Sequence, residues 1–156
     1  MRTTTRPAEP RDLPGFLGLA GQVEQWFGPM VTDPGFRAAV EKNIRRGTAL
    51  VAVTPDGAGP LGALLFGAKP PMYHVHWLVV AEGVRGRGIG RALLADALHR
   101  FVRPPGTVEV VTLGEDHPGA RESGARVFYE RLGFIPGDPE PPGPEGGSRQ
   151  RYRLAL

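Results

Sequence analysis

Residues 77–101 read WLVVAEGVRGRGIGRALLADALHRF, and three patterns follow one another within them. The first four residues form a short, partly β-branched apolar run, which predicts a strand buried on both faces. Residues 85–90 then alternate three glycines with two arginines and an isoleucine. From Ile89 to Phe101 the apolar residues recur at the spacing of one helix face. The segment therefore predicts a strand, a glycine-rich turn and an amphipathic helix.

A strand, a glycine-rich turn and a helix in this order can bind an anion. The first turn of a helix has N–H groups without a partner in the helix, and the helix dipole adds partial positive charge. Glycines let a phosphate approach those N–H groups, and arginines add forked donors with permanent charge. The loop alone is also compatible with a tight turn whose arginines lie in solvent. The residues that would surround a phosphate are Arg85, Gly86, Arg87, Gly88, Ile89, Gly90 and Arg91.

Two segments of the chain resemble motifs of the GNAT superfamily of N-acetyltransferases. Arg85, Gly88 and Gly90 occupy the three fixed places of that family's acetyl-CoA motif, Arg/Gln-x-x-Gly-x-Gly/Ala. Residues 78–80 resemble the strand that precedes this motif in the family. Residues 125–134, ARVFYERLGF, are similar to the family segment A-x-x-x-Y-E-x-L-G-F. Because both motifs occur in the right order and at a fitting separation, the chain is identified as a member of this superfamily.

The resemblance, which is good over residues 50–134 and poor at both ends, implies a GNAT-like fold. We expect a single α/β domain over residues 1–156, with a mixed, mostly antiparallel twisted sheet of about six or seven strands and about four helices. The fourth and fifth strands, about residues 73–80 and 107–113, would splay apart. In the family the pantetheine arm of acetyl-CoA enters that opening, which by position implies pairing with the main chain of Leu78, Val79 and Val80.

Acetyl transfer to an amine requires a neutral amine and a proton for the leaving thiolate. Tyr129 matches the tyrosine that often acts as general acid in the family, and a phenol keeps its proton at neutral pH. His74 lies eleven residues before Arg85, where some family members place a catalytic glutamate, and histidine can accept a proton near neutral pH. In a regular strand His76 would lie on the same side as His74. Core packing is the alternative explanation for Tyr129, His74 and His76.

Several other residues are open alternatives for roles in the site. Many relatives use ordered water instead of a dedicated base, and weaker base candidates here are Glu24, Glu115, Asp116 and His117. Relatives often carry an asparagine seven residues before the tyrosine, in contact with the cofactor arm, whereas this chain has Glu122. A carboxylate cannot donate a hydrogen bond as an amide does, so Glu122 either loses that contact or is a charge at a helix N-terminus. Candidates for lining the acceptor pocket, and equally for the core, are Trp26, Phe27 and Met30.

The rest of the chain predicts elements on both sides of the central segment. Asp12 and Asp33 mark helix starts, and residues 136–147, with five prolines and four glycines, predict a long loop. We also expect a strand at residues 2–6, a hairpin of residues 48–53 and 60–66, a loop at 114–124, a helix through 125–132 and a closing strand at 150–154.

Composition indicates which partners, compartment and cofactors to expect. The chain has 156 residues, no cysteine and a formal net charge of +3, and all but two of its 19 basic residues, Lys42 and Lys69, are arginines. These arginines are scattered, so nucleic-acid binding is not indicated. The chain has no apolar run of membrane-spanning length and no secretory signal, which together with the missing cysteine predicts a cytoplasmic protein without a membrane partner. The histidines lack carboxylates at ligand spacing, so no metal is expected.

The leading hypothesis is an acetyl-CoA-dependent N-acetyltransferase in which a primary amine attacks the donor directly in a ternary complex. The sequence does not decide whether its acceptor is a small molecule or a peptide. The alternative is a non-catalytic acyl-CoA-binding or sensor domain of the same fold. A dinucleotide-dependent oxidoreductase is disfavoured because Arg91 interrupts the pattern G-x-G-x-x-G. The resemblance makes a homodimer a reasonable expectation, with the arginine-rich residues 149–153 at an interface or on an exposed edge.

Overall fold

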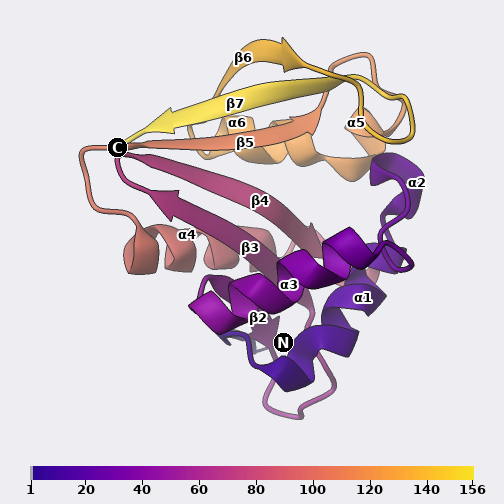
Figure 1. Cartoon of the computed structure of the whole chain (residues 1–156), viewed down its shortest axis with the longest axis vertical. Helices are drawn as coiled ribbons and strands as arrows, with labels where there is room; N and C mark the ends of the chain where they lie inside the picture. Colours follow the sequence, from indigo (N-terminus) through magenta and orange to yellow (C-terminus); the bar gives the residue numbers. More distant parts are fainter. Residues whose placement is uncertain (1) are drawn as a thin grey trace.

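Seven strands form one sheet, and the computed structural model describes them within residues 2–156 (Figure 1). They are β1 (Thr4–Pro7), β2 (Ala49–Val53), β3 (Gly62–Lys69), β4 (Met72–Val80), β5 (Thr107–Leu113), β6 (Ile135–Glu140) and β7 (Arg149–Ala155). Their order across the sheet is β1-β2-β3-β4-β5-β7-β6. Only β4 and β5 pair in parallel, and every other neighbouring pair is antiparallel. The predicted mixed, mostly antiparallel sheet is confirmed.

Residues 2–156 contain six α-helices and two short 3₁₀ turns, more than the four helices expected. They are η1 (Pro10–Asp12), α1 (Leu13–Gly21), α2 (Glu24–Phe27), α3 (Pro34–Arg46), η2 (Glu82–Val84), α4 (Ile89–Phe101), α5 (Gly119–Ser123) and α6 (Ala125–Arg131). Helix α5 corrects the predicted loop at residues 114–124. No helix in this described part of the chain has both the length and the apolar character needed to cross a membrane.

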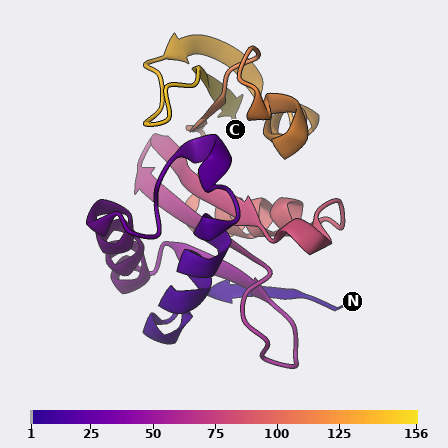
Figure 2. The same ribbon diagram turned by 90° about the vertical axis from the view of Figure 1, so that its right-hand side faces the viewer.

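The helices cover the two faces of the sheet unequally (Figure 2). Helices α1 and α3 pack on one face of β2, β3 and β4, and α4 packs on the opposite face. Helix α6 packs on β5 and β6 and shares an apolar cluster with α4, so these two helices lie on the same face. Among the described residues, α2 reaches the other face of β5, β7 and β6 near Leu113, and the rest of that face has no helix over it. We call it the open face of the sheet.

The C-terminal strands differ from the sequence-based expectation in two ways. Strand β7 pairs with both β5 and β6, so it is an internal strand, not the exposed edge that the sequence allowed. Strand β6 begins at Ile135, where the sequence predicts a short strand, but it continues to Glu140, into the stretch 136–147 predicted to be a loop. An edge strand tolerates proline because one side needs no ladder bond, and the register of β6 shifts between Pro136 and Pro139.

Aspartates mark the starts of α1 and α3 as predicted, but they act differently. The carboxylate of Asp33 caps α3 by accepting the N–H of Gly35 at 2.8 Å. The carboxylate of Asp12 instead accepts from Arg6 at 2.8 Å and from the N–H of Glu9 at 2.7 Å. Asp12 therefore connects β1 to the start of α1.

Strands β4 and β5 are paired only at their first residues. The register runs from Met72 opposite Thr107 to Val75 opposite Val110, and beyond that pair the two strands separate. On its other edge β4 stays paired with β3 as far as Val80. The predicted splay between the fourth and fifth strands is confirmed. It leaves one main-chain edge of the end of β4 without a neighbouring strand.

Candidate active site

Two cavities meet where β4 and β5 separate. The first, which we call the loop cavity, has a volume of about 770 Å³ and lies between the end of β4, residues 85–91, α5 and α6. The second, which we call the sheet cavity, has a volume of about 440 Å³ and lies between β4, β5, α2 and the β6–β7 loop. Both cavities are lined by the same five residues at their junction: Phe27, Leu78, Val79, Ala125 and Tyr129.

The glycine-rich loop lines the loop cavity, as the sequence predicts for a phosphate site. Gly86 and Gly88 have φ angles of 78° and 81°, in the left-handed region that favours glycine. A Cβ added at either position would meet no atom within 4 Å, so both glycines face open space. Gly88 directly precedes α4, whose first N–H groups have no partner within the helix. Six of the seven predicted loop residues line this cavity: Arg85, Gly86, Gly88, Ile89, Gly90 and Arg91.

Gly90 and Arg85 also have packing roles that the sequence did not indicate. A Cβ at Gly90 would lie 3.2 Å from Phe128 and 3.5 Å from Val80, so glycine allows α6 to approach the start of α4. The Arg85 Nε donates to the carbonyl oxygen of Val80 at 3.2 Å. The Arg85 guanidinium carbon lies 5.2 Å from the ring centroid of Trp26. Arg85 therefore connects the loop to the end of β4 and to α2.

The end of β4 offers main-chain groups to the loop cavity. Leu78, Val79 and Val80 line it, and in this part of β4 the register with β3 is complete while pairing with β5 has ended. An extended ligand can pair with such a free strand edge as an added strand would. The three residues for which the resemblance implies main-chain contacts therefore lie along this edge, where the Val80 carbonyl already accepts a hydrogen bond from Arg85.

Tyr129 lies at the junction of the two cavities. Its ring packs among Phe128, Phe134 and Tyr152, with centroid distances of 5.0, 5.4 and 6.4 Å. Burial raises the pKa of the Tyr129 phenol, so it stays protonated at neutral pH. Burial is the sole cause of this shift, and no hydrogen bond within residues 2–156 contributes to it, which leaves the hydroxyl available to a ligand. The position suits a proton donor.

His74 and His76 lie on the same face of β4, as predicted, and both line the sheet cavity. Their rings stack with centroids 5.8 Å apart and an interplanar angle of 17°. Beside them the register of β3 with β4 shifts between Leu65 and Phe66, so β4 has a bulge at His76. Partial burial lowers the pKa of His76, and electrostatic interactions with His74 and Lys69 lower it further.

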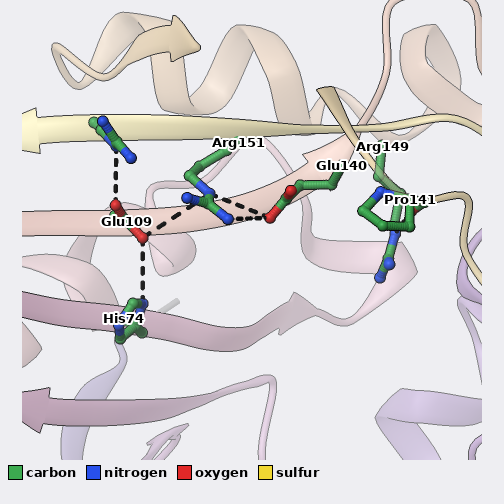
Figure 3. Close-up of polar contacts among 7 residues, drawn as sticks. His74, Glu109, Glu140, Pro141, Arg149 and Arg151 are labelled. Atoms are coloured by element: carbon green, nitrogen blue, oxygen red, sulfur yellow. Dashed lines mark hydrogen bonds and ion pairs between the residues drawn. The ribbon is translucent and has the colours of Figure 1, made fainter. Parts of the chain in front are cut away.

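The sheet cavity also contains polar residues that the sequence did not indicate as site residues: Glu109, Thr112, Arg149 and Arg151. Figure 3 shows Glu109, Arg149 and Arg151. Glu109 stands opposite His74 in the β4–β5 register, and its Oε2 lies 3.7 Å from His74 Nδ1. Arg153 Nε donates to Glu109 Oε1 at 2.9 Å. The one signal for Glu109 was a single charged residue within the apolar strand TVEVVTL.

The weaker base candidates are engaged elsewhere. Glu24 accepts the N–H groups of Met30 at 2.6 Å and Val31 at 3.1 Å, and these bonds lower the pKa of Glu24. His117 is buried, with its Nδ1 accepting the N–H of Gly119 at 2.8 Å. The four candidates that line neither cavity are Glu24, Glu115, Asp116 and His117.

The remaining sequence candidates divide between site and core. Trp26 lines the loop cavity and Phe27 lines both cavities, whereas Met30 is buried and lines neither. Glu122, in the place of the family's asparagine, is on α5 and lines the loop cavity. Arg87 is the one predicted loop residue outside this lining. Residues 2–156 contain no cluster of three or more histidine, aspartate or glutamate side chains that could hold a metal ion.

Comparisons with known proteins agree with this geometry. Residues 38–136 match the family model described as Acetyltransferase (GNAT) domain. Probable N-acetyltransferase Rv2775 of Mycobacterium tuberculosis is 28% identical over 143 residues, which cover 83% of this chain and 78% of that protein. The structure of Ard1 from Thermoplasma volcanium has a TM-score of 0.77 at 15% identity, covering 100% of this chain and 99% of that chain. PaiA N-acetyltransferase from Thermoplasma acidophilum, in complex with coenzyme A, has a TM-score of 0.77 at 14% identity and covers 100% of both chains.

The family match spans more than half of the chain and contains both the glycine-rich loop and the segment around Tyr129. The solved structures share the fold over the full length of this chain. The chain therefore belongs to the GNAT family and is an acyltransferase, an N-acetyltransferase.

Proposed function

We propose that this enzyme transfers the acetyl group of acetyl-CoA to a primary amine of a small molecule or peptide, which attacks directly in a ternary complex. The observation that carries the proposal is that two cavities, one suited to the donor and one to the acceptor, meet at Tyr129. Direct transfer requires the amine nitrogen and the thioester carbon to meet at one point with little freedom of movement. The junction of the cavities provides such a point.

The loop cavity is the donor side in this proposal. The backbone N–H groups at the start of α4, with open space before Gly86 and Gly88, suit the pyrophosphate, and Arg91 adds charge at the same cavity. The free edge of residues 78–80 suits the amide groups of the pantetheine arm. Acetyl-CoA, when bound, supplies an activated acetyl group as a thioester.

Tyr129 is the proposed general acid. As the amine nitrogen bonds to the carbonyl carbon and the carbon–sulfur bond breaks, the thiolate takes the proton of the Tyr129 hydroxyl. Burial keeps this phenol protonated at the pH where the amine reacts, because the raised pKa moves ionisation to more alkaline pH. The tyrosinate is then reprotonated by solvent.

His74 is the proposed base on the acceptor side. It lines the sheet cavity together with Tyr129, so one cavity joins the acid to the base. The attacking amine gains a positive charge when its bond to carbon forms, and His74 takes the surplus proton directly or through a water molecule. The acceptor then leaves as a neutral amide.

The test is acceptor-dependent release of free thiol from acetyl-CoA, with Tyr129→Phe as the diagnostic variant. Phenylalanine keeps the ring packing and removes the proton donor, so kcat should fall about 10²–10⁴-fold while CoA affinity changes little. The matched control is Tyr152→Phe, because the Tyr152 hydroxyl donates to Glu130 at 3.2 Å and lines neither cavity. Unchanged turnover in Tyr129→Phe would contradict the acid role.

The alternative, a non-catalytic acyl-CoA sensor, makes a different prediction in the same assay. A sensor should bind acetyl-CoA without thiol release for any amine in a panel of small amines and N-terminal peptides. Its CoA affinity should be equal in Tyr129→Phe and in the wild type. Thiol release that depends on an acceptor and falls in Tyr129→Phe would exclude the sensor.

A further inference from the structure

Glu109 is a buried carboxylate with no role in the mechanism proposed so far. It is 8% exposed and lines the floor of the sheet cavity. It lies on β5 one residue before Val110, which forms the last β4–β5 pair. Removing a carboxylate from water is costly unless charged or hydrogen-bonded partners compensate. The partners of Glu109 therefore show how the fold uses it.

The two carboxylate oxygens of Glu109 have different surroundings (Figure 3). Oε1 accepts a hydrogen bond from Arg153 Nε at 2.9 Å. Oε2 has two cationic or potentially cationic neighbours beyond hydrogen-bond distance, His74 Nδ1 at 3.7 Å and Arg151 Nε at 4.0 Å. Arg151 is itself held by an ion pair with Glu140 on β6. The arginines thus fix the carboxylate, and its second oxygen is directed at the His74 ring.

We propose that Glu109 is a positioning residue that orients His74 as the base; this inference rests on the proposed function. A neutral imidazole carries one N–H, and a carboxylate beside Nδ1 favours the tautomer with the hydrogen on Nδ1. The lone pair of His74 is then on Nε2, the nitrogen away from Glu109, where it can accept the proton of the attacking amine. The carboxylate also stabilises the imidazolium that results, as in other carboxylate–histidine pairs.

Charged groups from several strands face this pair. His76 on β4 stacks on the His74 ring, and Lys69 at the end of β3 acts electrostatically on His76. Arg151 and Arg153 on β7 form ion pairs with Glu109. Glu109 is the carboxylate that approaches the His74 ring within 4 Å in the described part of the chain. Glu140 is on the same open face and shares Arg151, but it forms no ion pair with His74. Glu140 therefore serves as a matched control for the loss of a negative charge.

The first test measures the tautomer of His74 from the ring ¹⁵N chemical shifts of the purified enzyme, at a pH where the ring is neutral. The wild type should carry the hydrogen on Nδ1. Glu109→Gln should shift the population towards the Nε2–H form, because a neutral amide stabilises a nearby N–H electrostatically less than a carboxylate does. Glu140→Gln should leave the population unchanged. A wild-type His74 with its hydrogen on Nε2 would overturn the inference, and this measurement needs no acceptor and no turnover.

The second test is a double-mutant cycle on kcat. Glu109→Gln should lower kcat about 10²-fold, the lower end of what a general base contributes, with the KM for acetyl-CoA unchanged. Glu140→Gln should lower it by less than about threefold. Because Glu109 acts through His74, adding Glu109→Gln to His74→Ala should cause no further loss. Additive losses, or an equal loss in Glu140→Gln, would show that the charge network is merely structural and would overturn the inference.

Failure of the proposed function would give a different experimental result from failure of the inference about Glu109. A wild-type enzyme that binds CoA and acetylates no amine contradicts the proposed function, while the tautomer of His74 still decides the role of Glu109. Thermal unfolding of each variant is the control that its chain is folded. Glu109→Asp keeps the charge and shortens the side chain, so it should retain the wild-type tautomer preference more fully than Glu109→Gln.

Discussion

On the β3 side of β4 the sheet has helices on both faces, whereas on the β5 side α6 covers one face and the other is open. The pairing differs in the same way, with eight residue pairs between β3 and β4 and four between β4 and β5. Most of the largest fully buried side chains belong to the doubly covered side, although Tyr152 on β7 is also fully buried. The open face carries the Glu109–Arg151–Arg153 network. The active site therefore lies where the doubly covered half of the sheet meets the half whose unpaired strand edge and open face are accessible to ligands.

The strongest test of this comparison concerns stability. Phe66, 1% exposed, stacks with Tyr73 and Phe101 at centroid distances of 6.3 and 5.5 Å. Phe66→Ala should lower the free energy of unfolding by about 3–5 kcal/mol, because it leaves a cavity in the doubly covered half. Val111, 41% exposed on β5, is the control, and Val111→Ala should change the free energy by about 0.5 kcal/mol or less. Urea unfolding measures both, and similar losses would mean that the two halves do not differ in this way.

Local signals allowed much of this fold to be predicted. Helix α4 and strand β5 begin and end at the predicted residues because a glycine turn, apolar periodicity and the Pro104-Pro105-Gly106 break mark them within the sequence itself. The two motifs also led to Tyr129 and to the glycine-rich loop, both of which line the loop cavity. What depended on neighbouring residues in the chain was therefore predictable.

Features set by distant contacts were not predictable. Glu109 meets His74 only through the β4–β5 register, which joins segments 35 positions apart in the numbering. Helix α5 lies in a loop-like sequence and packs against α2, where a Cβ at Gly119 would be 2.2 Å from Trp26. The position of β7 between β5 and β6 likewise depends on pairing between segments that are not adjacent in the sequence. A periodic pattern records which face of an element is buried and not which partner buries it.

The next prediction tests whether binding can be lost at the meeting point of the two halves without losing the fold. Gly88→Val places a β-branched residue at a φ of 81°, which costs about 1–3 kcal/mol, and fills the space before the α4 N-terminus. CoA affinity should fall tenfold or more, about 1.4 kcal/mol, by calorimetric titration. The control is Gly83→Val, in η2 of the same loop, where φ is not positive and a Cβ meets nothing within 4 Å. Equal losses in both variants would count against binding by the α4 N–H groups.

The smallest effect is expected at Arg85, which contacts both β4 and α2. Its hydrogen bond to Val80 and its position over Trp26 suggest that it orders the loop, so Arg85→Ala should weaken CoA by about two- to fivefold, the equivalent of 0.5–1 kcal/mol. Because ordering the loop serves the whole donor, pantetheine, which has no phosphate, should lose the same factor. Arg91→Ala is the contrasting variant, since Arg91 is exposed on the first turn of α4 and should affect CoA alone. A loss in Arg85→Ala that is confined to CoA would instead make Arg85 a phosphate ligand and leave α2 without a part in holding the donor.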